Sequence, residues 1–199
     1  MASFLQRPRV YFVAVIVVAG GYLLVVFARS IGGGVPAEFS DARLQGAVIA
    51  QNIVNLSSRS MADLEAINKL DKSGNFTEAL NLVTAAVTRS QEIRDEAVKL
   101  SGELEKMTQS LSDLRSLDAR QAALEAISNH LALISRLINY SGYFSQLLEV
   151  LRNKFTVGGV KGDRVGTLVN QINTEVTAIN SFNIQAIQAM KKFDDLVKS

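Results

Sequence analysis

Residues 76–114 read FTEALNLVTAAVTRSQEIRDEAVKLSGELEKMTQSLSDL. This stretch decides the fold, because its apolar residues recur at steps of three and four or their multiples, the spacing of a helix that packs against other helices. Asn75 precedes it, with Glu78 three residues later, which resembles a helix-capping box. The apolar residues that carry the pattern are Phe76, Leu80, Val83, Val87, Ala97, Leu104 and Leu111.

Three further segments, residues 36–71, 118–155 and 164–198, carry the same kind of apolar periodicity. We expect Asp118 and Asp163 to cap the second and third of these helices. No stretch has the alternation of a strand, and the turns between segments are short, two of the three with Gly. The sequence therefore predicts an all-α domain, an up-down-up-down four-helix bundle. The apolar residues that repeat along 118–155 are Leu124, Ile127, Leu131, Ile134, Ile138, Leu148 and Leu151.

Residues 10–28, VYFVAVIVVAGGYLLVVFA, contain no charged side chain. As a helix they would reach ~28 Å, close to the ~30 Å hydrocarbon core of a bilayer. A cleaved signal peptide is the alternative, but its apolar region is typically only ~7–15 residues long. We therefore expect a transmembrane signal anchor that contacts the lipid bilayer. It follows a short cytoplasmic N-terminus at residues 1–9.

The residues on either side of this anchor predict how the chain is placed. Arg7 and Arg9 precede it and only Arg29 follows closely, so the positive-inside rule puts the N-terminus in the cytoplasm. Residues 29–35 form a Gly-rich hinge, and the bundle domain at 36–199 is then periplasmic or extracellular, in a single-pass membrane protein. A small bundle without disulfides in that compartment favours a bacterial origin.

Charge and composition exclude several kinds of site. Three of the 21 Lys and Arg flank the anchor, which leaves 18 against 19 Asp and Glu, so no basic face suited to nucleic acid is expected. The absence of Cys excludes thiolate nucleophiles and zinc-thiolate sites. His130 is the only histidine, and we interpret it as a residue at the edge of the bundle. We predict no enzymatic activity, no cofactor and no metal.

Two surfaces are candidates for binding. The first is the end of the bundle near the Gly158-Gly159 loop, where aromatic and basic residues gather: Tyr140, Tyr143, Phe144, Arg152, Lys154, Phe155, Lys161 and Arg164. The second is an uncharged polar face on residues 164–198, which would pack against another subunit: Asn170, Asn173, Thr177, Asn180 and Gln188. Depletion of charge is typical of the centre of protein–protein interfaces. A solvated neutral surface is the alternative for this face, and an aromatic plug of the core is the alternative for the end.

The order of a cytoplasmic start, one membrane helix and four long helices resembles the extracytoplasmic sensor modules of bacterial chemoreceptors. Those modules continue into a second membrane helix, which carries the signal to a cytoplasmic domain. The resemblance therefore implies ligand sensing, with a partner that relays the signal. The charge-poor helices favour a different function. We expect a membrane-anchored structural or adaptor protein whose bundle binds a protein partner or forms a homo-oligomer.

Overall fold

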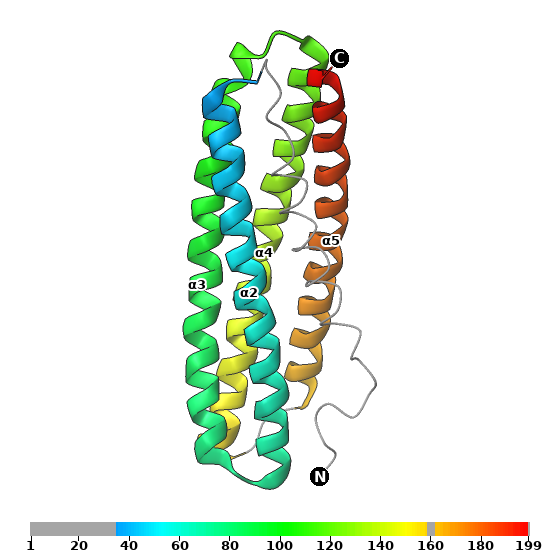
Figure 1. Cartoon of the computed structure of the whole chain (residues 1–199). Helices are drawn as coiled ribbons and strands as arrows, with labels where there is room; N and C mark the ends of the chain where they lie inside the picture. The colour runs from blue at the N-terminus through cyan, green and yellow to red at the C-terminus, as the bar shows by residue number, and fades with distance from the viewer. Residues whose placement is uncertain (1–34, 159–161, 199) are drawn as a thin grey trace.

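The computed structural model describes residues 35–158 and 162–198, and these form four long helices. They are α2 (Ala37–Ser73), α3 (Phe76–Gln109), α4 (Leu117–Val157) and α5 (Gly162–Lys198), with a short 3-10 helix, η1 (Ser110–Asp113), after α3. Figure 1 shows them running up and down in chain order, with the start of α2 and the end of α5 at the same end. The all-α four-helix prediction is confirmed.

No helix within residues 35–158 and 162–198 is both long and apolar enough to cross a bilayer. The predicted anchor at residues 10–28 lies outside the part of the chain that the structure describes, as does most of the predicted hinge.

The turn between α2 and α3 forms as its sequence predicts. Gly74 adopts a left-handed conformation with φ of 76°, which ends α2, and the amide of Asn75 donates to the carbonyl of Leu70 at 3.0 Å. The Asn75 side chain accepts from the amide of Glu78 and donates to its carboxylate at 2.8 Å. Asn75 therefore caps α3, but the capping box is incomplete, because the backbone amide of Asn75 donates to Leu70 and not to the Glu78 carboxylate.

The other two predicted caps are wrong. Ser116 caps α4, since its hydroxyl accepts from the amide of Ala119 at 3.2 Å, and Asp118 lies inside the first turn. Asp163 lies inside α5, which already begins at Gly162. In α4 the acidic Asp118 within the first turn still interacts favourably with the helix dipole.

The core is built from smaller residues than the sequence pattern predicts. Along α3 the buried positions follow steps of three and four, and they are Ala79, Val83, Ala86, Ser90, Ile93, Ala97, Leu100, Leu104 and Met107. Phe76, by contrast, is 46% exposed. On α4 the inner face includes Ala119, Ala123 and Ala126, whereas Leu124, Leu131 and Ile138 lie outside it. Small inner residues let the helices pack closely.

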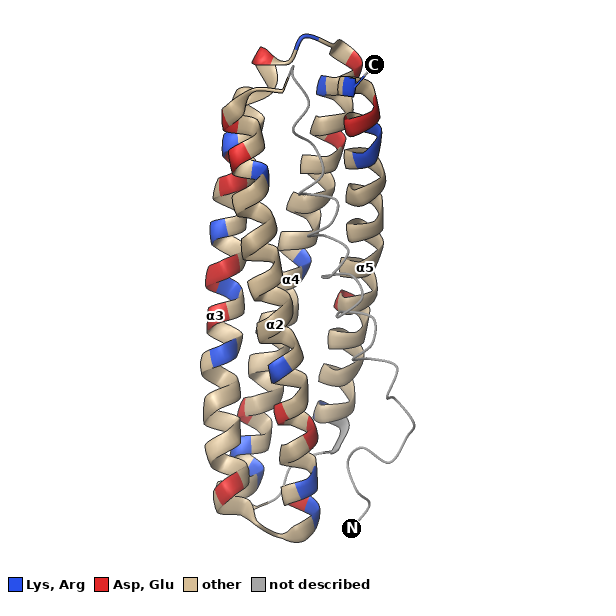
Figure 2. Cartoon of the chain, in the orientation of Figure 1, with Lys and Arg blue, Asp and Glu red and all other residues tan. Residues whose placement is uncertain are grey.

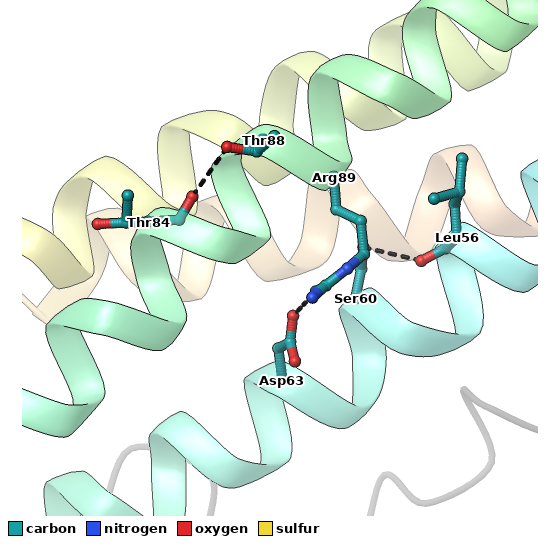
Figure 3. Close-up of polar contacts among 6 residues, drawn as sticks. All are labelled: Leu56, Ser60, Asp63, Thr84, Thr88 and Arg89. Atoms are coloured by element: carbon teal, nitrogen blue, oxygen red, sulfur yellow. Dashed lines mark hydrogen bonds and ion pairs between the residues drawn. The ribbon is translucent and has the colours of Figure 1, made fainter.

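Helices α2 and α3 pack tightly along their length. Gly46 leaves room for the side chain of Leu100, whose Cδ1 would lie 3.4 Å from a Cβ at that position. Further along the pair, Arg89 of α3 forms an ion pair with Asp63 of α2 (Figure 3). In the same region Ser60 donates to the carbonyl of its own helix at Leu56, 3.0 Å away. The Arg89–Asp63 pair thus adds a polar contact between α2 and α3 to the apolar core that they share, which includes Ile53 and Leu100.

Helices α2 and α5 are spaced more widely. No Cα atom of α2 lies within 8 Å of a Cα atom of α5, whereas each consecutive pair of helices approaches more closely than that. Arg43 of α2 spans the distance to Asp194 of α5, with two hydrogen bonds of 2.6 and 2.9 Å. Next to them the rings of Phe39 and Phe193 lie 5.0 Å apart. These contacts connect α2 to α5 at one end of the bundle.

Candidate interaction surfaces

The predicted surface at the end of the bundle is only partly present. Tyr140 and Phe144 are buried in the core, 1% and 0% exposed, and their rings stack at 5.8 Å. Burial raises the pKa of the Tyr140 hydroxyl above its ordinary value. Both rings belong to a core cluster that contains residues of α2, α3 and α5 as well, and therefore they do not line a surface open to solvent. For these two residues the structure favours the core plug over the binding surface.

The remaining residues of that end make contacts within the bundle. Phe155 stacks on Phe76 with ring centroids 5.7 Å apart, and Lys154 donates to Asp71 of α2 at 2.5 and 2.7 Å. These pairs join α4 to α3 and to α2 across the end of the bundle. Arg152 forms an exposed ion pair with Glu149 on its own helix. Of the others, Tyr143 is half-buried, Arg164 is exposed, and Lys161 lies outside the described residues.

The predicted polar face of α5 divides into two sides. Asn170, Thr177 and Gln188 are exposed, as expected for a surface. Asn173 and Asn180 are half-buried instead, and each has a buried Oδ1 atom without a hydrogen-bond partner. Asn173, Asn180, Ile187 and Asp194 follow one another at steps of seven residues along one side of the helix, and Asp194 binds α2. These two asparagines therefore lie on the side of α5 that faces α2.

A buried polar cluster lies between the helices at the end where α2 begins. Arg43 and Asp194 are only 3% and 7% exposed. His130 of α4 is 3% exposed, and its Nδ1 atom lies 2.9 Å from the carbonyl oxygen of Ala126. Burial is the main cause that lowers the pKa of His130 to about 4, and the charge of Arg43 contributes. The prediction that His130 lies at the edge of the bundle is wrong, because α4 places it inside.

The structure adds a surface that the sequence reading did not identify. Four large apolar residues on α4 are exposed at intervals of seven: Leu117, Leu124, Leu131 and Ile138, with exposed fractions of 74%, 48%, 46% and 37%. We call them the outer stripe. The strict seven-residue repeat is the sequence signal for this surface, and the predicted core pattern of residues 118–155 wrongly includes three of the four residues, Leu124, Leu131 and Ile138. Exposed apolar residues in a continuous row are typical of contact surfaces.

Charge is distributed unevenly over the helices. Figure 2 shows charged residues along much of α3, whereas long stretches of α4 and α5 carry none. On α3, Lys99 and Lys106 form ion pairs with Glu96 and Glu103 at 2.6 and 2.8 Å, which is the arrangement of a solvated helix surface. The surfaces of α4 and α5 therefore cost less to remove from water than that of α3.

One polar groove lies between α2 and α3, with a volume of about 330 Å³. Its walls are charged and amide side chains together with Leu56: Asn52, Asn55, Arg59, Glu92, Asp95, Glu96 and Lys99. Within residues 35–158 and 162–198 no group of three or more His, Asp or Glu side chains is arranged to hold a metal ion. No known protein family, curated protein or solved structure matches this chain.

Proposed function

We propose that this protein is a membrane-anchored, non-enzymatic structural protein whose helical bundle assembles with other copies of itself or with a protein partner outside the cytoplasm. One observation carries the proposal: the outward surfaces of α4 and α5 combine exposed apolar side chains with uncharged polar ones. Leu131 of α4 and Ile184 of α5 are 46% and 55% exposed, and the uncharged polar residues Asn170 and Thr177 of α5 are exposed as well. Such surfaces are depleted in charge, as interface centres are.

The interior of the bundle supports a structural function as well. Its buried polar groups hold helices together: Arg43 binds Asp194, and Ser90 shares hydrogen bonds with Ser141 and Ser145. With a pKa of about 4, His130 is neutral near pH 7 and contacts a carbonyl of its own helix. These arrangements rigidify a long bundle, which suits a protein that presents surfaces to a partner.

The proposal is tested first by membrane attachment. Membranes from cells that express the full chain are washed with alkaline carbonate, beside a variant that lacks residues 10–28. We expect the full chain to stay in the membrane pellet and the variant to be released. The orientation is tested by Thr177→Cys, since the natural chain has no cysteine that would react in its place. A membrane-impermeant maleimide should label this variant in intact spheroplasts, and labelling only after lysis would contradict the proposed placement.

Assembly is tested by the mass of the full chain in detergent micelles, measured by sedimentation over a hundredfold range of concentration. Defined oligomers support self-assembly. A monomer at every concentration, together with no co-purifying protein after cross-linking in cells, would overturn the proposal.

A further inference from the structure

The outer stripe of α4 points to a specific mode of assembly. A heptad repeat has two core positions in every seven residues. The outer stripe occupies one of them, and the other, which we call the companion position, holds small or uncharged residues: Gln121, Ser128, Ser135 and Gly142. Gln121, Ser128 and Ser135 are exposed, and Gly142 is half-buried. Large apolar residues thus occupy one of the two core positions of a heptad repeat along about 25 residues of helix, and polar or small uncharged residues occupy the other, which gives half of the apolar seam of a coiled coil.

No other helix in the described part of the chain exposes such a row. The remaining exposed large apolar residues on α2, α3 and α5 are isolated, such as Val98 and Ile184, or form a single neighbouring pair. None of them repeats every seven residues. The inner face of α4 is already occupied by its own bundle. Helix α4 therefore carries two helix-packing faces, and the bundle covers only one of them.

We propose that two copies of this chain pair in parallel through the outer stripe of α4, with Leu117, Leu124, Leu131 and Ile138 of one copy against the same residues of the other. The inference rests on the proposed function and names the surface through which two copies assemble. In a parallel pair, equivalent heptad positions meet across the two-fold axis, so each apolar layer is formed by two identical side chains.

Charge complementarity favours a second copy as the occupant. In a parallel coiled coil, the residue before each companion position lies near the residue five further along on the partner helix. At the first companion position, Gln121, these two residues are Arg120 and Glu125, and this is the one charged pair among the four companion positions. Neither side chain forms an ion pair within the described residues, and Glu125 is exposed. A parallel pair would bring Arg120 of each copy to Glu125 of the other, on both sides of the axis.

The parallel direction also agrees with attachment to one membrane. In a parallel pair the N-terminal ends of both α2 helices lie at the same end of the assembly. Both anchors can then enter the same bilayer. The anchor sequence itself has small residues seven apart, Ala14, Gly21 and Ala28, which permit close approach of two membrane helices. An antiparallel pair would direct the two anchors toward opposite ends.

Single-cysteine cross-linking tests the pairing in the full chain, reconstituted in vesicles of phosphatidylcholine and phosphatidylglycerol. The natural chain has no cysteine, so each variant carries one thiol. Gln121→Cys and Ser135→Cys occupy two companion positions 14 residues, or ~21 Å, apart on α4. Both should form a disulfide-linked dimer under mild oxidation. Thr177→Cys on α5 is the control, and we expect at least tenfold less dimer from it.

A second pair of substitutions identifies the surface. Leu131→Lys places a charge in the outer stripe, and Ile184→Lys is its matched control on α5, since the two residues are 46% and 55% exposed. In the Ser135→Cys background we expect Leu131→Lys to lower the dimer fraction about tenfold and Ile184→Lys to leave it unchanged. Thermal melts followed by circular dichroism check that both variants fold.

The outcomes separate this inference from the proposed function. Cross-linking at only one of the two α4 positions would indicate an antiparallel pair and overturn the parallel arrangement. Strong cross-linking of Thr177→Cys that Ile184→Lys abolishes would place assembly on α5, which overturns this inference but leaves the proposed function standing. No cross-link at any position, with a monomeric mass in detergent, would overturn the pairing and remove self-assembly from the proposed function.

Discussion

Substitution of Asp194 by Asn removes one charge of the buried pair that connects α2 to α5. The pair is bidentate, with distances of 2.6 and 2.9 Å, and both residues are nearly inaccessible to water, 3% exposed for Arg43 and 7% for Asp194. The variant leaves the Arg43 guanidinium buried without its counter-charge. Removal of one partner of a buried ion pair destabilises proteins by about 3–5 kcal/mol, and we expect a loss in that range.

The position of the pair extends the effect of the substitution beyond the two side chains. The Cα atoms of α2 and α5 are nowhere within 8 Å of each other, so the backbones of these helices do not support one another as those of the other neighbours do. The nearby contact of Phe39 with Phe193, whose ring centroids are 5.0 Å apart, depends on the same approach of the two helices. When the pair is broken, α5 is free to move away from α2 at this end.

The assay is reversible urea unfolding of the full chain in mild detergent, followed by circular dichroism at 222 nm. The double variant Arg43→Met/Asp194→Leu removes both charges and keeps apolar volume, so we expect it to be destabilised by less than about 1.5 kcal/mol. The matched control is Glu65→Gln, which removes one partner of a surface ion pair. Lys69 and Glu65 lie 2.9 Å apart, with side chains 72% and 69% exposed, and we expect a change of at most about 0.5 kcal/mol.

Two results would refute the reasoning. A loss below about 1 kcal/mol for Asp194→Asn would mean that Arg43 finds water or another partner when the carboxylate is gone. A double variant as unstable as the sum of Arg43→Met and Asp194→Leu would show that the two side chains do not act as a pair.

Three further changes are expected to affect stability. Between pH 6.5 and 4 the free energy of unfolding of the wild type should fall by ~3 kcal/mol through His130, because the unfolded state binds a proton there and the folded state does not. In urea titrations the His130→Gln variant should lack this part of the pH dependence, and an unchanged dependence would contradict the prediction. Gly74→Ala should cost ~1 kcal/mol, since φ there is +76°, whereas Gly102→Ala, where a Cβ meets nothing within 4 Å, should be neutral or stabilising in thermal melts; equal effects would refute the conformational explanation. Asn75→Ala should cost ~1 kcal/mol by loss of the cap, and an unchanged melting temperature would show that solvent replaces it.

The helices themselves were predictable from the sequence, because their lengths and turns depend on local chemistry. Asn75 and Gly74 set one turn through local hydrogen bonds and a left-handed backbone. The break after Gln109 was not predicted: there the chain changes to a 3-10 turn, and the Ser110 hydroxyl donates to the carbonyls of Lys106 and Met107. Such a change depends on how the helix end packs against α4.

The faces of the helices were harder to predict than their positions. On α4, Leu124 and Ile127 both fit a helical apolar repeat, yet Leu124 is 48% exposed and Ile127 is 1% exposed. Alanines such as Ala123 and Ala126 occupy the inner face instead, because closely spaced helices leave little room for side chains. The sequence pattern ranks residues by size and hydrophobicity, whereas the spacing of neighbouring helices decides which residues enter the core.

The same limit explains how the candidate surfaces changed. Asn173 and Thr177 are both polar and uncharged, so the sequence placed them on one face. Buried apolar side chains of α5, such as Ile172, Val176 and Phe193, fix its rotation together with the link between Asp194 and Arg43. That rotation turns Asn173 toward α2 while Thr177 stays exposed. Core packing thus decides which polar residues of α5 are available to a partner, and the packing of α4 likewise leaves its outer stripe exposed.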